Sequence, residues 1–501
     1  MELVQNFPFF AIMLYLAGGV TCCVLKPKAS ETVCLLLNIL VTCLMAAVLL
    51  YTISFVSGTS YNFMMGHFPA PWGNEIRIGP LEALMAVVLP GVMTLILFGN
   101  MKHIYEDIEP EKVSLYFTVC NLLMVSLLAL VFTNDIFTGY VFVEINTIAS
   151  CALVMVRYRS GKALAATTRY LIMSLLGSGM FLIGIVILYD LTGHLLMEPA
   201  GKAVAALLQS GEYTFPLTIV TGLFAVGMGL KSALWPFHEW LPDAHGSATS
   251  ASSGILSGLV LKGYIILFIK LSQRVLGAEI SADSSVLTVL FFFGIAGMLF
   301  GSLSALHEKD VKRMLAYSSV AQIGYIYAGI GLGTRDGLIA AFIQIIVHAF
   351  TKPMLFTAAG GLMDVSGGSR KLTDLRGSGR RNPLAGIAFS VGALSMIGIP
   401  LFGGFITKIT LTQAVITASP MKTAVGITVI ILSTVLNALY YLPYISVIFT
   451  RNEDGHFGEN KCAPSVGFLL SLLLFIILNF FIGTHSGIFT RIISSGLNLF
   501  A

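Results

Sequence analysis

Apolar runs follow one another along almost the whole chain, and only short polar stretches separate them. When helical, a run of about 20 apolar residues crosses the hydrocarbon layer of a bilayer. The strands of a membrane barrel would alternate apolar and polar residues instead. The pattern therefore predicts an all-α polytopic membrane protein with no soluble domain between its spans. We place about fourteen spans, at residues 8–25, 31–57, 81–99, 113–132, 136–156, 166–191, 216–236, 248–272, 285–306, 313–332, 336–363, 384–411, 423–448 and 464–484.

The distribution of Lys and Arg supports this number of spans and predicts an orientation. Loops after odd-numbered spans hold 18 of the 29 basic residues, and loops after even-numbered spans hold 5. Basic loops face the cytoplasm in most membrane proteins. We therefore expect a multi-pass protein of the cell membrane with both termini on the outer side. A count wrong by one span would destroy the asymmetry.

Several ionisable side chains lie inside spans, although charged residues make up only 11% of the chain. A charge at mid-membrane costs about 2.5–3.5 kcal/mol on insertion scales, and such residues usually line a polar path. Lys270 lies near the end of its span, and we expect it to extend to the membrane interface. The others predict a buried ion or proton path, to which Lys352 is an additional contributor. They are Glu144, Lys231, Lys262, His348, Lys352 and Lys408.

Two spans combine helix-weakening residues with a lysine, and both are expected to be broken helices. Span 7 reads LFAVGMGLKSALWPF around Lys231, and span 12 reads MIGIPLFGGFITKITL around Lys408. Irregular backbone at membrane depth is tolerated only where protein or a water-filled cavity satisfies it. The two breaks lie five spans apart, and an odd number of spans inverts a repeat across the membrane. Paired breaks of this kind point to a transport site.

Glu144 and Lys231 form the natural pair for a proton switch. A carboxylate about 4 Å from an ammonium contributes about 4 kcal/mol at an effective dielectric constant of 20. Making or breaking this pair would therefore decide whether the lysine holds its proton. Beyond Lys231, the segment HEWLPDAHGS offers His238, Asp243 and His245 as residues that pass protons to or from cytoplasmic water. The same segment could equally be the polar loop that any helix pair needs.

Four motifs carry a resemblance to a known family: KSALWPFHEWLPDAH, EKDVKRMLAYSSVAQIGY, IVHAFTKPMLFTAAGG and IPLFGGFITK. They resemble the antiporter-like subunits shared by Mrp-type cation/proton antiporters, respiratory complex I and membrane-bound group 4 hydrogenases. The resemblance covers roughly residues 80–450. It implies two inverted five-helix repeats, helices 4–8 and 9–13, with broken helices 7 and 12. The implied division is 1–112 (helices 1–3), 113–272 (first repeat), 285–448 (second repeat) and 464–501 (helix 14 and tail).

The resemblance also implies roles for individual residues. Glu144 is similar to the family's helix 5 glutamate, Lys231 to its helix 7 partner and Lys262 to the helix 8 relay lysine. His348 is similar to the helix 11 histidine and Lys408 to the terminal residue of broken helix 12. One complex I subunit type has glutamate there, so lysine favours a D-type Mrp subunit or a hydrogenase-type relative. The stretch AHGSATSASSGILSG lacks the family's usual proline, so we expect the start of helix 8 to differ from the family's.

These observations predict a proton-translocating, or Na⁺/H⁺-translocating, membrane subunit of a multisubunit complex. We expect other membrane subunits (antiporter-like paralogues and small helical subunits) and the lipid bilayer as partners, and no nucleic acid. No cofactor is expected, and no metal, because the seven cysteines lack metal-ligand spacing. Without a redox centre of its own, the chain needs energy from a cation gradient or a partner's redox reaction. The alternatives are a stand-alone transporter of a small solute, a quinone-contacting oxidoreductase subunit and a purely structural scaffold.

Overall fold

A computed structural model describes residues 2–54, 59–69, 73–157, 160–277, 285–451 and 464–499. Up to residue 132 the helices are α1 (Glu2–Gln5), α2 (Phe7–Val24), α3 (Pro27–Ser54), α4 (Pro80–Asp107) and α5 (Val113–Phe132). Next come α6 (Ile136–Met155), α7 (Gly161–Thr192), α8 (Met197–Ser210), α9 (Thr214–Lys231), α10 (Trp240–Ser247), α11 (Ser250–Ile255), the π-helical turn η3 (Leu256–Val260) and α12 (Leu261–Arg274). The last are α14 (Ser285–His307), α15 (Val311–Gly331), α16 (Arg335–Asp364), α17 (Ser378–Arg381), α18 (Pro383–Ile397), α19 (Gly403–Ile416), α20 (Pro420–Phe449), α21 (Val466–Thr484) and α22 (Ser486–Leu497).

The described part of the chain contains twelve helices long and apolar enough to cross a membrane. The predicted polytopic helical protein is therefore confirmed, while the number fourteen stays a prediction. The tenth predicted span is α15, which is rich in polar residues, and the twelfth is divided into α18 and α19. Neither belongs to the twelve. The division of the chain into two inverted repeats also stays a prediction.

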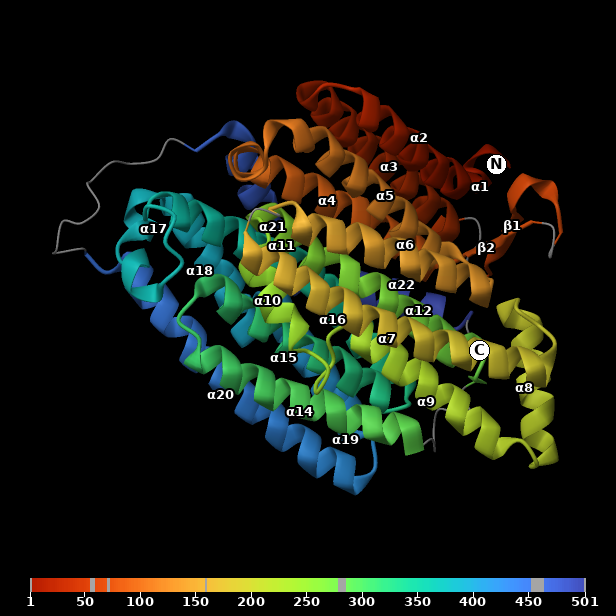
Figure 1. The fold of residues 1–501 in the computed structure, drawn as a ribbon. Coiled ribbons are helices and arrows are strands. Elements are labelled where there is room, and N and C mark those ends of the chain that lie inside the picture. The colour runs from red at the N-terminus through yellow and green to blue at the C-terminus, as the bar shows by residue number, and fades with distance from the viewer. Residues whose placement is uncertain are drawn as a thin grey trace.

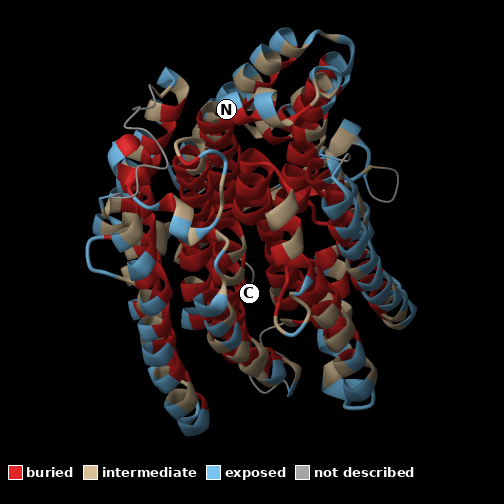
Figure 2. Ribbon diagram, turned by 60° about the vertical axis from the view of Figure 1, so that its left-hand side comes forward, coloured by how far each residue is buried: buried red, intermediate tan, exposed pale blue. Residues whose placement is uncertain are grey.

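The helices lie side by side, with α2 and α3 at one edge and α14, α19 and α20 at the other (Figure 1). Buried residues concentrate in the central helices, and exposed residues cover the outer faces (Figure 2). The span from Ser250 to Arg274 is buried throughout its most apolar stretch. Ionisable side chains on this span are therefore shielded from both lipid and water.

Both termini lie at the end of the bundle that carries a small β-hairpin. Its strands β1 (Tyr61–Met64) and β2 (Glu75–Ile78) are antiparallel, with Tyr61 opposite Ile78. Phe9 of α2 contacts Phe63 of β1, and Arg77 of β2 donates a hydrogen bond to the main-chain oxygen of Leu499 at 3.0 Å. This arrangement fits termini on one side of the membrane. Which side that is stays a prediction.

Side-chain caps explain where several helices begin. The carboxylate of Asp135 accepts a hydrogen bond from the main-chain N–H of Thr138 at 2.6 Å at the start of α6. Asp310 accepts in the same way at the start of α15. At the start of α11, where the family's proline is missing, the hydroxyl of Thr249 accepts from the N–H of Ser252 at 3.0 Å. Each cap satisfies an N–H that lacks a partner within its helix.

The break in the seventh span lies after Lys231, not before it. Gly227 belongs to α9, where it packs against α7: a Cβ at this position would lie 2.8 Å from the main-chain oxygen of Gly177. The glycine therefore permits a close crossing of two helices rather than a break. The helix ends at Lys231, and Ala233 has a φ of 58°. The seventh span is therefore broken, as the sequence predicted, and its break follows the lysine.

The twelfth span is also broken, as the sequence predicted, and its break precedes Lys408. Helix α18 ends at Ile397, and Gly398 has a φ of 92°, a conformation that L side chains rarely adopt. Helix α19 starts at Gly403. A Cβ at Gly404 would lie 1.8 Å from the main-chain oxygen of Ser395, so only glycine fits where the two half-helices meet. The two breaks thus differ: one follows its lysine and the other precedes it.

Lys270 does not extend to the membrane interface, contrary to the sequence prediction. Its side chain is fully buried, and its ammonium donates hydrogen bonds to the main-chain oxygens of Val131, at 2.7 Å, and Thr133. These oxygens lie at the C-terminal end of α5, where carbonyl groups lack partners within the helix. Lys270 therefore caps a neighbouring helix.

Candidate functional site

Glu144 of α6 and Lys231 of α9 form an ion pair inside the bundle. Lys231 Nζ lies 3.3 Å from Glu144 Oε1 and donates a hydrogen bond to Thr147 Oγ1 at 2.8 Å. Ser178 of α7 donates a second hydrogen bond to the Glu144 carboxylate. The lysine side chain is fully buried, whereas that of Glu144 is 24% exposed. The pair expected from the sequence is thus in contact, with a hydroxyl group on each partner.

An aromatic stack holds the end of α9. The indole Nε1–H of Trp240 donates to the main-chain oxygen of Leu230 at 3.2 Å, an oxygen that the break leaves without a helical partner. The Trp240 ring stacks on Tyr170 of α7, with centroids 4.1 Å apart. The segment after Lys231 contains two tryptophans. The second of them, Trp240, fixes the position of Lys231 by binding the preceding residue, Leu230.

Lys262 of α12 and His348 of α16 meet at the middle of the molecule, and both are fully buried. The Lys262 ammonium contacts His348 Nδ1 and donates to the main-chain oxygen of Ser257. Ser257 belongs to the π-helical turn η3 directly before α12, and such turns occur frequently at functional sites. An ammonium only donates hydrogen bonds, so Nδ1 accepts and neutral His348 carries its proton on Nε2. Within the described ranges, Nε2 has no hydrogen-bond partner.

Lys352 lies one turn beyond His348 on α16 and is also fully buried. Its ammonium donates to the main-chain oxygen of Leu315 at 3.0 Å and to Tyr441 OH at 3.3 Å. The charges of Lys262 and Lys352 both act on His348. Three ionisable groups from α12 and α16 therefore form one cluster, which we call the central cluster: Lys262, His348 and Lys352.

His245 lies deep in the protein rather than in a water-exposed loop. It is on the short helix α10, has no exposed surface, and stacks on Phe356 with ring centroids 4.8 Å apart. Burial, followed by the positive charges of Lys312, Lys352 and Lys262, lowers the pKa of His245 well below its usual value. Neither ring nitrogen has a hydrogen-bond partner in the part of the chain that is described. His245 therefore adjoins the central cluster.

The two other residues predicted at the cytoplasmic end have different surroundings. Asp243 accepts hydrogen bonds from Arg169 Nη1 at 2.6 Å and from Arg313 Nη1 at 2.7 Å. It thus joins α7, α10 and α15 through ion pairs that the sequence did not reveal. His238 is only partly buried, and that burial lowers its pKa.

Lys408 binds across the break in the twelfth span. Its ammonium donates to the main-chain oxygen of Ile397, the last residue of α18, and to Thr434 Oγ1 of α20 at 2.8 Å. The ammonium also lies 5.7 Å from the centre of the Tyr325 ring. A cation at the C-terminus of a helix is stabilised by the helix dipole. Lys408 is therefore held by the polar end of the broken helix.

The ionisable groups differ in how far hydrogen bonds connect them to one another. Among the residues described, no hydrogen bond connects the Glu144–Lys231 pair directly to Lys262. The central cluster, in contrast, is followed by a chain of buried hydroxyl and amide groups leading toward Lys408. Sequence reasoning missed these residues; for those that lie in span 13, the signal was polar positions spaced three or four apart. The chain comprises Tyr441, Ser318, Tyr440, Asn437, Ser302 and Ser433.

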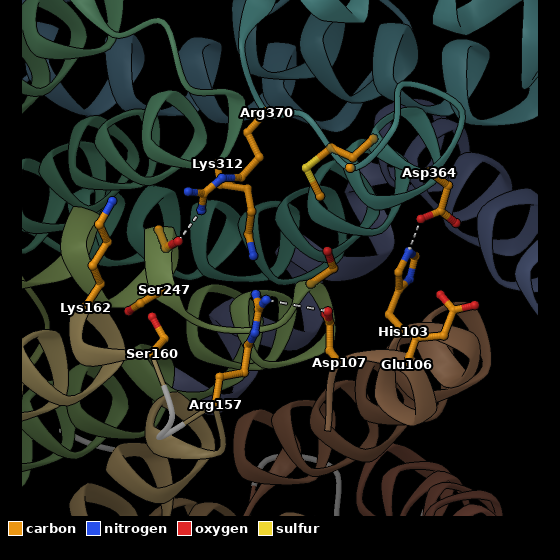
Figure 3. Close-up of a pocket in the computed structure, with 14 residues that line it drawn as sticks. His103, Glu106, Asp107, Arg157, Ser160, Lys162, Ser247, Lys312, Asp364 and Arg370 are labelled. Atoms are coloured by element: carbon orange, nitrogen blue, oxygen red, sulfur yellow. Dashed lines mark hydrogen bonds and ion pairs between the residues drawn. The ribbon is translucent and has the colours of Figure 1, made fainter. Parts of the chain in front are cut away.

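A cavity of about 510 Å³ opens at the end of the bundle where the basic loops gather (Figure 3). It lies between the ends of α4 and α16, the turn before α7, and the starts of α11 and α15. His103 Nε2 contacts Asp364 at 2.9 Å on one wall, and Arg157 lies 3.9 Å from Asp107 on another. The buried Lys312 lines the cavity, and its charge acts on His245. The cavity therefore reaches one buried titratable group, Lys312.

The family is evident from comparison with known sequences. Residues 133–436, more than half of the chain, match the transmembrane family of NADH:quinone oxidoreductase and Mrp antiporter proteins. The chain belongs to this family, which confirms the resemblance seen in its motifs. It is therefore an antiporter-like, multi-pass membrane subunit.

Individual relatives come from different complexes. NADH-quinone oxidoreductase subunit N of Desulforudis audaxviator (strain MP104C) is 32% identical over 414 residues, covering 82% of this chain and 80% of the relative. A Na(+)/H(+) antiporter subunit of Alkalihalophilus pseudofirmus (strain ATCC BAA-2126 / JCM 17055 / OF4) is 27% identical over 432 residues, covering 81% of this chain and 52% of the relative. The chain thus spans about half of that longer protein. A chain of the membrane-bound sulfane sulfur reductase, an archaeal respiratory membrane complex, shares the fold with a TM-score of 0.87 at 24% identity, covering 100% of this chain and 98% of that chain.

Proposed function

We propose that the protein translocates protons as one subunit of a larger membrane complex. The observation that carries this proposal is the contact between Lys262 and His348, which brings two fully buried titratable groups together in the bundle. Buried ionisable groups in a membrane usually serve transport, because they are costly to insert. The proposed order is Glu144/Lys231, Lys262, His348 and Lys408, with Lys352 beside His348. In a second form of this proposal, the protein transports Na⁺ as well as protons.

The Glu144–Lys231 pair acts as the switch at one end of this path. Thr147 and Ser178 solvate the two charges, so the pair can separate without leaving either group bare. When the pair is intact, the carboxylate favours the proton on Lys231. When the pair opens, the buried ammonium loses that support and gives its proton up more readily.

The cavity at the basic end is the proposed connection to cytoplasmic water. Protons enter through the cavity that Lys312 lines, and His245, beside the central cluster, is the next titratable group inward. Asp243 contributes by holding α10 in place through its two arginines, and His238 lies at the margin of the same segment. This assignment places the cavity on the inner side of the cell membrane and both termini on the outer side.

The energy for pumping comes from outside this chain. Moving one charge against the membrane potential costs about 2.3 kcal/mol per 100 mV. The relatives belong to respiratory and antiporter complexes, so a redox-active partner or a cation gradient supplies this energy. Neighbouring membrane subunits, antiporter-like paralogues and small helical subunits among them, are the expected partners.

The test uses the intact parent complex in sealed proteoliposomes with a pH-sensitive dye inside. Lys262→Ala and Lys408→Ala are each expected to abolish turnover-driven acidification while the complex still assembles. The control Lys202→Ala changes an exposed lysine of α8 that pairs with Glu198 at 2.9 Å. If both buried variants assemble and pump normally, the path is wrong. Solute uptake by the purified chain alone would favour a stand-alone transporter instead.

A further inference from the structure

The chain of polar groups between Lys352 and Lys408 contains one member that cannot carry a proton. From Lys352, contacts lead to Tyr441 OH at 3.3 Å and on to Ser318 Oγ at 2.9 Å. Ser318 Oγ contacts Tyr440 OH at 2.9 Å, and Tyr440 OH lies 2.9 Å from Asn437 Oδ1. All of these side chains are buried. Three hydroxyl groups therefore end at an amide.

The orientation of the Asn437 amide follows from its main-chain partner. Its Nδ2 donates to the main-chain oxygen of Met396 at 3.2 Å. If the amide were turned over, Oδ1 would face that carbonyl oxygen, two acceptors without a proton between them. The oxygen therefore faces the hydroxyl groups. On its other side, Ser302 Oγ also approaches Asn437 Oδ1, at 3.1 Å.

This orientation fixes which groups donate at Asn437. An amide oxygen has no proton to give, so Tyr440 OH donates to Asn437 Oδ1 from one side and Ser302 Oγ donates to it from the other. Tyr440 OH is also the donor to Ser318 Oγ, so its single proton is shared between the two oxygens. Lys352 donates to Tyr441, and in the contact between Tyr441 and Ser318 either oxygen can be the donor. Asn437 Oδ1 thus accepts from both sides and passes no proton on.

We propose that Asn437 is a proton barrier between the central cluster and Lys408. A proton leaving Lys352 can pass along Tyr441, Ser318 and Tyr440 but cannot be handed on by the amide, and Ser302 approaches the same oxygen from the other side. The proposal rests on the proposed proton path and adds to it a point of interruption. A pump needs such a point, because an uninterrupted path would dissipate the gradient that it builds.

Asn437 itself transfers no proton, and replacing it by a residue that can do so is expected to open the path. In Asn437→Asp, the carboxylate oxygen at the Oδ1 position accepts the proton from Tyr440, which forms one O–H bond as the Tyr440 O–H bond breaks. The same oxygen then gives that proton to Ser302, which also approaches it, so the carboxylate is restored. Ser302 Oγ lies 3.4 Å from Ser433 Oγ, and the next residue of α20 in the sequence is Thr434, the hydrogen-bond partner of Lys408. The altered chain would therefore conduct protons without turnover.

A matched control exists in a distant part of the protein. Asn38 of α3 is also fully buried, its Oδ1 accepts from Tyr15 OH at 2.8 Å, and its Nδ2 donates to the main-chain oxygen of Cys34 at 2.8 Å. Asn38→Asp thus adds a carboxyl group in nearly the same local setting, away from Lys352 and Lys408. Any general effect of a buried carboxyl group appears in both variants.

The experiment measures passive proton conductance of proteoliposomes that contain the whole complex, without substrate, under a potassium–valinomycin potential. Asn437→Asp is expected to raise this conductance several-fold over the wild type, with fewer protons pumped per turnover, while Asn38→Asp is expected to leave it unchanged. Adding Tyr440→Phe to Asn437→Asp removes the donor and should restore the low conductance. If Asn437→Asp does not assemble, Asn437→Ser, whose hydroxyl can relay a proton, replaces it with the same expectation.

The barrier is refuted if the assembled variant conducts no more than the wild type, or if Tyr440→Phe fails to suppress an increased conductance. Because conductance is measured without turnover, this result is independent of the pumping assay with Lys262→Ala. If Asn437 is not a barrier, the proposed function in proton translocation is unaffected. Normal pumping by Lys262→Ala and Lys408→Ala would remove the function itself.

Discussion

Lys270 Nζ lies 2.7 Å from the main-chain oxygen of Val131, so a lysine of α12 closes the end of α5. Replacing Lys270 by methionine leaves these carbonyl groups without a donor. Hydrogen bonds to charged groups contribute about 1.5–3 kcal/mol each. We expect Lys270→Met to lower the melting temperature of the detergent-solubilised complex clearly, as measured by loss of the monodisperse chromatographic peak on heating.

Pumping by the Lys270→Met protein that does assemble should be close to normal, because Lys270 is not part of the proposed path. The exposed substitution Lys202→Met serves as the control for loss of one lysine charge. Undisturbed stability together with lost pumping would mean that Lys270 transfers protons, contrary to its assignment as a cap.

The Glu144–Lys231 pair should tolerate the loss of one partner poorly. Removing one member of a buried ion pair costs about 3–5 kcal/mol, and the partial exposure of Glu144 places the effect near the lower end. Glu144→Gln is expected to abolish most proton pumping in dye-loaded vesicles. Glu198→Gln, which breaks an exposed pair of 2.9 Å with Lys202, should have no effect. Equal pumping by the two variants would show that the switch lies elsewhere.

Trp240 offers a way to separate stacking from hydrogen bonding at the end of α9. Trp240→Phe keeps an aromatic ring against Tyr170 but loses the hydrogen bond to Leu230, which should cost about 1 kcal/mol. Trp240→Ala loses both and should cost about 3–5 kcal/mol. Thermal denaturation of the purified complex would rank the two. A larger loss for phenylalanine than for alanine would contradict the stacked arrangement.

His245 predicts a dependence of stability on pH. Burial and the neighbouring lysines lower its pKa in the folded protein, so below the ordinary histidine value of 6.5 the unfolded chain binds a proton that the folded protein rejects. Stability is therefore expected to fall as pH drops below about 6.5, by up to about 1.4 kcal/mol per unit. His245→Phe can stack on Phe356 and should weaken this dependence. Identical pH profiles of melting temperature for the two proteins would disprove the effect.

The membrane fold and the burial of most of the ionisable groups could be predicted, because both follow from the free-energy cost of placing apolar groups in water or charges in a membrane. Long apolar runs seldom form anything other than membrane-spanning helices. A lysine inside such a run, such as Lys262, is costly to bury and therefore indicates a functional role. The pairing of Glu144 with Lys231 followed from their opposite charges and from the roles that the family resemblance implies. The other inferences need only composition and position along the chain.

Other features depended on contacts that no local pattern encodes. Lys270 looked like an interface residue because nothing in its own span announces the open end of α5. His245 looked exposed because HEWLPDAHGS is polar, yet α10 is turned inward by the packing of Trp240 on Tyr170. Asn437 was overlooked because an amide carries no charge, and its role arises from the direction of its neighbours' hydrogen bonds.

The hydrogen bond from Lys408 to Ile397 couples the charge of the lysine to the position of the broken helix. The ammonium serves as a latch that holds the end of α18 against the body of α19. A cation at a helix C-terminus contributes about 0.3–1 kcal/mol, and up to about 2 kcal/mol when partly buried. Losing its proton would remove that attraction and loosen the hinge at Gly398. In the proposed path, the arrival or departure of a single proton at Lys408 would thereby change the force that holds the two half-helices together.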